Sequence, residues 1–98
     1  MLYIGVLQFT LEIPYAVSLK DKRSVIKGLR DRLRRSFNVS ISEFDDQDIA
    51  TYATLGAVVA GSDTKHVNST MDHLLNELRD WRDGSLTNHQ LEILSPDQ

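Results

Sequence analysis

Apolar and polar residues alternate along Leu2–Ile13, the first patterned stretch of the chain. The odd positions of its second half are all apolar: Leu7, Phe9, Leu11 and Ile13. A period of two is typical of a β-strand that is covered on one face. In the first half, Leu2, Ile4 and Val6 make the opposite face apolar as well. We therefore expect this end of the strand either to be buried on both sides or to leave an apolar patch for a partner.

A helical period follows from Leu19 to Phe37. When successive positions advance by 100°, the apolar residues of this segment fall within an arc of about 120°, the width of a core-facing stripe. They are Leu19, Val25, Ile26, Leu29, Leu33 and Phe37. Ser18, three residues before Asp21, forms a capping pattern for the first turn. The segment is therefore predicted to be an amphipathic helix that begins near Ser18 or Leu19.

Two further strands are expected after this helix, joined as an antiparallel hairpin. Residues 37–43 alternate between apolar and polar, which predicts a strand that directs Phe37, Val39 and Ile41 inward. Residues 51–60 are small or β-branched on both faces, as is typical of a strand inside a sheet. The polar residues Asp45–Asp48 would connect the two strands.

The remaining elements complete a recognisable order. A second amphipathic helix is expected from Thr64 to about Arg82, before Gly84, and a last strand within residues 85–94. The order β-α-β-β-α-β predicts an α+β fold of the ferredoxin-like type, with two helices on one face of a four-stranded antiparallel sheet. The first and third strands should then lie in the middle of the sheet. We expect one domain over residues 1–95 and a frayed tail at 96–98.

The face of this sheet that the helices leave uncovered is the first candidate contact surface. Its expected members are Ile4, Val6, Gln8, Thr10, Tyr52, Thr54, Gly56 and Val58. Because the face is apolar at one end, we expect a homodimer contact there rather than bare surface.

The absence of cysteine excludes several chemistries. The 98 residues are 41% hydrophobic and 26% charged, an ordinary composition for a folded domain. With no cysteine there are no disulfides, thiolate nucleophiles, iron–sulfur clusters or cysteine-based zinc sites. The chain shows neither a signal peptide nor a run of the ~18 apolar residues that a membrane span requires. We expect a cytoplasmic protein without a membrane partner.

Positive charge is concentrated in the first helix. The chain has a net charge of −3, but eight Lys or Arg and two Asp give the segment 19–37 a charge of +6. Arg23, Lys27, Arg30 and Arg34 form one stripe, roughly 16 Å long, with Lys20 beside it. Like charges at these spacings repel, which favours compensation by phosphate or by the protein's own acids. A merely solvated helix face is an equally ordinary explanation.

No catalytic or cofactor motif is present, and no cofactor or metal is expected. Glu43, Asp45, Asp46 and Asp48 could bind Mg²⁺ or Ca²⁺, but they lack an EF-hand pattern and are more typical of a solvated hairpin tip. His66 and His73 would stand about 10 Å apart on the second helix, too far to share one ion. The third strand lacks the aromatic run of an RNA-binding sheet. Enzymatic activity is unsupported rather than excluded.

Several short blocks resemble the YlxP-like proteins, a family of short bacterial proteins of uncharacterised function. The blocks are Ser18–Arg23, Arg32–Arg34, Phe37–Ser40, Asp45–Asp48 and Ala53–Gly56. The resemblance implies a ferredoxin-like fold, genes placed among those of translation initiation and ribosome maturation, and a suspected link to ribosome-binding factors. It implies no reaction.

The leading hypothesis is an RNA- or ribosome-associated binding module that contacts phosphates with its basic helix. The residues proposed for this contact are Lys20, Lys22, Arg23, Lys27, Arg30 and Arg34. The alternative is a homo-oligomeric or small-anion-binding protein in which the basic helix meets the acidic 43–48 loop of a neighbour. Lys22 lies near the apolar arc, and whether it points towards a pocket is open.

Overall fold

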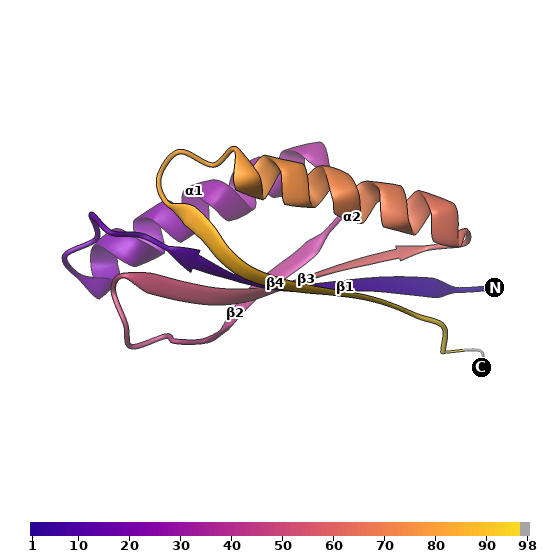
Figure 1. Ribbon diagram of the computed structural model, residues 1–98, viewed down its shortest axis with the longest axis horizontal. Helices are drawn as coiled ribbons and strands as arrows, with labels where there is room; N and C mark the ends of the chain where they lie inside the picture. The colour runs from indigo at the N-terminus through magenta and orange to yellow at the C-terminus, as the bar shows by residue number, and fades with distance from the viewer. Residues whose placement is uncertain (97–98) are drawn as a thin grey trace.

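The computed structural model describes residues 1–96 and has the predicted order of elements. These are β1 (Tyr3–Glu12), α1 (Leu19–Ser36), β2 (Ser40–Asp45), β3 (Tyr52–Gly61), α2 (Thr64–Arg79) and β4 (Ser85–Leu94). Both helices lie on the same side of the sheet, and no element covers its other side (Figure 1). The predicted ferredoxin-like sandwich is confirmed.

The sheet has the strand order β2-β3-β1-β4, and every neighbouring pair is antiparallel. The first and third strands are therefore central, as predicted. β1 and β3 pair without interruption from Tyr3–Gly61 to Glu12–Tyr52. The register between β1 and β4 shifts next to Thr10, and that between β2 and β3 shifts after Glu43. Such bulges bend an edge strand without ending it.

The core lies between the sheet and the two helices. Alternate residues of β1 point into it, and the helices contribute one buried stripe each. Its members include Leu7, Phe9, Leu11, Ile26, Leu29, Leu33, Leu55, Met71, Leu74 and Leu78. Gly5 allows α2 to approach closely, because a Cβ there would lie 2.8 Å from Val67 Cγ1 and 2.9 Å from Met71 Cε. The alternation that predicted β1 is thus the alternation between core and open face.

Element boundaries differ from the predictions by a few residues. β2 begins three residues later than expected and continues to Asp45, so that Phe44 belongs to the strand. Phe37, extended in conformation, is the C-cap of α1 rather than part of β2. α2 ends at Arg79, and Trp81 packs into the core from the following loop. Of the tail expected to fray, residues 97–98 lie outside the described residues.

Candidate functional site: the basic face of α1

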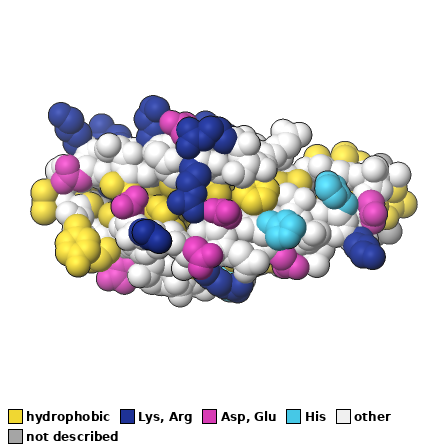
Figure 2. All heavy atoms as spheres, turned by 90° about the horizontal axis from the view of Figure 1, so that it is seen from above, with side chains coloured by type: hydrophobic (Ala, Val, Ile, Leu, Met, Phe, Trp, Pro, Cys, Tyr) yellow, Lys and Arg dark blue, Asp and Glu magenta, His cyan; other side chains and the backbone are white. Residues whose placement is uncertain are grey.

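Eight of the eleven Lys and Arg residues of the chain lie in α1, and none lies in any of the four strands. The dark blue side chains in Figure 2 accordingly gather along one edge of the helical layer. α2 carries only Lys65 and Arg79, balanced by Asp72 and Glu77. The positive surface of the protein is therefore largely a property of a single helix.

The start of this helix is held by its own side chains. Ser18 Oγ accepts a hydrogen bond from Asp21 N at 3.1 Å, and Asp21 Oδ2 accepts one from Val17 N at 3.1 Å. Two backbone N–H groups near the first turn are thereby paired, as in a capping box. The predicted capping pair is confirmed, and it sets the direction in which the cations leave the helix start.

The outward cations of α1 are only partly neutralised within the chain. Lys27 pairs with Asp31 at 2.9 Å, and Arg32 pairs with Glu77 of α2 at 2.6 Å. The hydrogen bond from Lys27 and the nearby positive charges lower the pKa of Asp31. Within residues 1–96, the cations of α1 that take part in no ion pair are Lys20, Arg23, Arg30, Arg34 and Arg35. These five carry charge that the protein itself leaves uncompensated.

Arg30 and Arg34 lie on the side of α1 that approaches β2. Arg34 Nη2 donates to the carbonyl of Ile41 in β2 at 3.3 Å, although the residue as a whole is exposed. Arg30 is half-buried, and its Nε is buried without a hydrogen-bond partner. Both guanidinium groups therefore keep N–H donors that a bound anion can use.

Lys22 does not belong to this surface, so its prediction as a phosphate contact is wrong. Only 1% of the residue is exposed. Its Nζ donates to the carbonyls of Asp46 at 2.8 Å, Tyr52 at 3.0 Å and Gln47 at 3.4 Å, and lies 2.8 Å from Glu43 Oε2. An ammonium group has three donors, and all are taken up inside the protein. Lys22 therefore anchors the β2–β3 loop to the start of α1.

The β2–β3 loop is ordered by this anchor and by Asp46. Asp46 is in the left-handed conformation with φ of 58°, which Asp tolerates better than most residues. Its carboxylate accepts a hydrogen bond from Thr54 Oγ1 at 2.6 Å. Two of the four acids singled out from sequence, Glu43 and Asp46, are thus engaged internally, whereas Asp45 and Asp48 are exposed.

Other candidate sites gain no support from the geometry. Across residues 1–96, no group of three or more His, Asp or Glu side chains is placed to hold a metal ion. Glu77, considered with His73, is paired with Arg32. A cleft of about 360 Å³ opens beside the start of α1 and has both signs of charge on its walls. No helix in the described part of the chain is long and apolar enough to cross a membrane.

Comparison with known proteins finds relatives without a described activity. The family described as "Protein of unknown function (DUF503)" matches residues 4–91. The "Uncharacterized protein YlxP" of Bacillus subtilis (strain 168) is 35% identical over 60 residues, which cover 61% of this chain and 65% of that protein. Among solved structures, the de novo designed protein Ferredog-Diesel is similar with a TM-score of 0.40 and 10% identity, covering 97% of this chain and 85% of that one.

Proposed function

This chain belongs to the DUF503 family of proteins of unknown function, and we propose that it is an RNA- or ribosome-associated binding module. The contact surface is the exposed face of α1. The observation that carries the proposal is the concentration of cations without ion pairs on one helix of a chain whose net charge is −3.

The chemistry of this face suits phosphate groups. Lys20, Arg23, Lys27, Arg30 and Arg34 present ammonium and guanidinium groups along one side of an 18-residue helix. Phosphate contacts of this kind position a nucleic acid without reading its sequence. The exposed Lys27–Asp31 pair can exchange its carboxylate for a phosphate, because both side chains are open to solvent. The expected ligand is structured RNA, bound through its backbone.

The opposite side of the molecule does not offer a second phosphate surface. The four strands contain no Lys or Arg, whereas Glu12, Asp45 and Glu92 lie on or beside the uncovered sheet face. A polyanion would be repelled there. Binding through α1 is therefore distinct from the sheet-face binding of RRM domains.

Titration of a structured RNA hairpin and of purified ribosomal subunits at several salt concentrations tests this proposal. With about four phosphate contacts, the logarithm of the association constant should fall with the logarithm of salt concentration with a slope of roughly −3 to −4. Combined replacement of Arg23, Lys27, Arg30 and Arg34 by Glu should abolish binding at 150 mM salt. Replacement of Lys65 and Arg79 by Glu on α2 is the matched control and should change affinity much less. A flat salt dependence, or normal binding by the α1 variant, contradicts the proposal.

The alternative, in which α1 binds the acidic loop of a neighbouring copy, rests on Asp45 and Asp48. These two carboxylates remain exposed, but Glu43 and Asp46 are held inside their own chain. The Asp45→Lys/Asp48→Lys variant should dissociate such an oligomer in light scattering. An unchanged mass would exclude the loop as its contact.

A further inference from the structure

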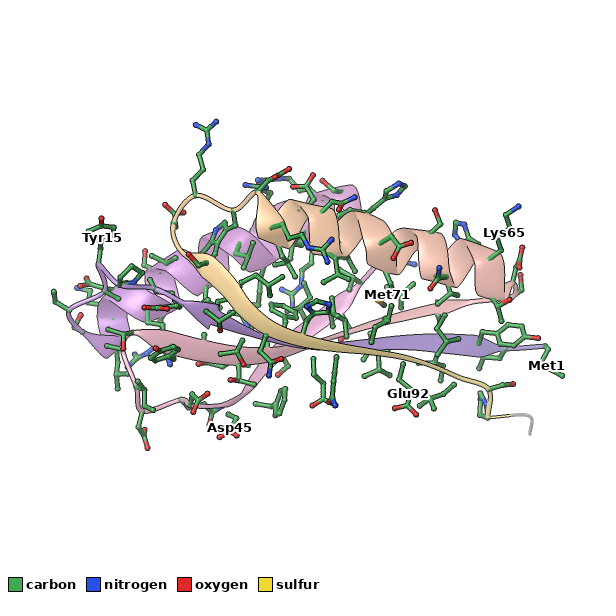
Figure 3. The ribbon with its side chains drawn as sticks, viewed as in Figure 1. Met1, Tyr15, Asp45, Lys65, Met71 and Glu92 are labelled. Carbon is green, nitrogen blue, oxygen red and sulfur yellow. The ribbon has the colours of Figure 1, made fainter. Side chains whose placement is uncertain are left out.

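The uncovered face of the sheet is arranged in rows that run across the strands. From the end that holds the chain termini, the register gives Leu94–Ile4–Ala60, Glu92–Val6–Val58–Ser40, Gln90–Gln8–Gly56–Ser42, Asn88–Thr10–Thr54–Asp45 and Glu12–Tyr52. The first two rows are mainly apolar, the next two are polar, and acids lie at the far end. Glu92 points away from the helices, whereas Met71 points from α2 towards the sheet (Figure 3).

Large apolar side chains on this face are open to solvent. Val58 is 40% exposed, Leu94 43% and Phe44 50%. The ring of Phe44 lies over Gly56, since a Cβ built on that glycine would be 3.7 Å from the ring. A sheet that is covered by helices on one face and apolar over part of the other is typical of an association surface.

We propose that this face binds the same face of a second copy, so that two sheets pack as an aligned sandwich with the helices outside. The two-fold axis runs parallel to the strands, between β1 and β3. This axis places β1 over β3 of the second copy and β2 over β4 of the second copy, while each row stays opposite its own row. The proposal is independent of RNA binding.

The register makes this arrangement complementary to itself. Val6 then lies over Val58 of the second copy, and Ile4 over Ala60, so the apolar rows meet. Each acid of the face meets a hydrogen-bond donor instead of another acid. The pairs are Asp45 with Asn88, Glu92 with Ser40, and Glu12 with the hydroxyl of Tyr52, each across the interface. Aligned sheets cross at about 30°, so the middle rows should keep this register best.

The size of the face suits a dimer. Four strands about 4.8 Å apart and up to ten residues long cover roughly 500–600 Å² in projection. The relief of the side chains brings the accessible area close to the ~800 Å² per partner of a stable interface. Both α1 helices remain on the outer layers, so the basic faces stay free in the dimer.

Sedimentation equilibrium from about 1 to 300 μM tests whether the dimer exists and where its contact lies. The wild-type chain should dimerise, and Val58→Glu should be monomeric while its far-ultraviolet circular dichroism stays unchanged. Asn76→Glu, on the exposed side of α2, is the matched control and should dimerise normally. A wild-type chain that is monomeric throughout, or a Val58→Glu variant that still dimerises, overturns the proposal.

Position 88 tests the register, because it lies on the opposite edge of the sheet from Asp45 within one chain. Asn88→Asp should weaken the dimer about 3- to 30-fold through two Asp–Asp contacts, and Asn88→Lys should tighten it by a similar factor. Both effects should disappear when Asp45 is replaced by Asn. Asn88 and Asp45 are exposed, so these variants retain the fold. Effects of equal sign for Asp and Lys at position 88 overturn this register.

Discussion

The two helices cover the same face of the same sheet, yet only one of them is charged. α2 buries five residues in the core and has as many acids as bases, whereas α1 buries four residues and carries a charge of +6. Packing on the sheet therefore requires an apolar stripe but no particular charge on the outer face. The outer charge of α1 is free to serve a partner.

The difference becomes sharper within α1 itself. Its eight cations have the same sign but different surroundings: Lys22 is enclosed by carbonyls and Glu43, whereas its neighbour Arg23 is exposed. One cation of the helix thus belongs to the fold, and the others belong to the surface. The following substitutions separate these roles.

Replacement of Lys22 by Met should give the largest loss of stability. It leaves the Glu43 carboxylate and three loop carbonyls without their common partner, and we expect a loss of about 3–5 kcal/mol. Urea unfolding followed by circular dichroism measures this loss. Arg23→Met is the control and should change stability by less than about 0.5 kcal/mol. Similar values for the two variants would mean that Lys22 does not anchor the loop.

Truncation of the core face should affect the two helices alike. Leu33 of α1 and Leu74 of α2 are both fully buried, and Leu→Ala at either position should cost about 2–5 kcal/mol. Thermal and urea unfolding of the two variants gives the comparison. If Leu33→Ala cost less than about 1 kcal/mol, α1 would be held mainly by its polar contacts rather than by packing.

Gly28 should distinguish the surface of α1 from that of α2, which has no glycine. A Cβ at position 28 would have no neighbour within 4 Å, so Gly28→Ala should stabilise the protein by about 0.5–1 kcal/mol. The melting temperature measures this gain. Weaker RNA binding by the stabilised variant would show that the glycine admits a close approach of the RNA backbone. A decrease in stability would contradict the open position of Gly28.

Asp31 should produce the smallest effect, and only in acid. Its pKa is lowered from the usual 3.8, first by the hydrogen bond from Lys27 and then by nearby positive charges. The pair therefore stabilises the protein above about pH 4, and this contribution is lost as the pH falls through the lowered pKa. Asp31→Asn should melt slightly below wild type at pH 7, and the two should converge towards pH 2. In a Lys27→Met background, most of this pH-dependent difference should vanish.

The helices, the strands and their order could be predicted from sequence because periodicity records which side of each element faces the core. The burial of Lys22 could not, because its partners lie 21 to 30 residues away and include three backbone carbonyls, which no side-chain pattern reveals. Its place near the apolar arc was the available signal. Phe44 was missed because acids flank it and a bulge follows Glu43, which interrupts the alternation.

The position of β1 has a consequence for the order of folding. It is the first strand in the chain and a central strand of the sheet, and its neighbours are β3 and β4. Its partners therefore begin about 40 to 80 residues later in sequence, so neither β1 ladder can form from local contacts. The β2–β3 hairpin closes over only a few residues and can form first. We expect the apolar β1 to stay unpaired until late in folding, the interval in which this chain is most prone to aggregate.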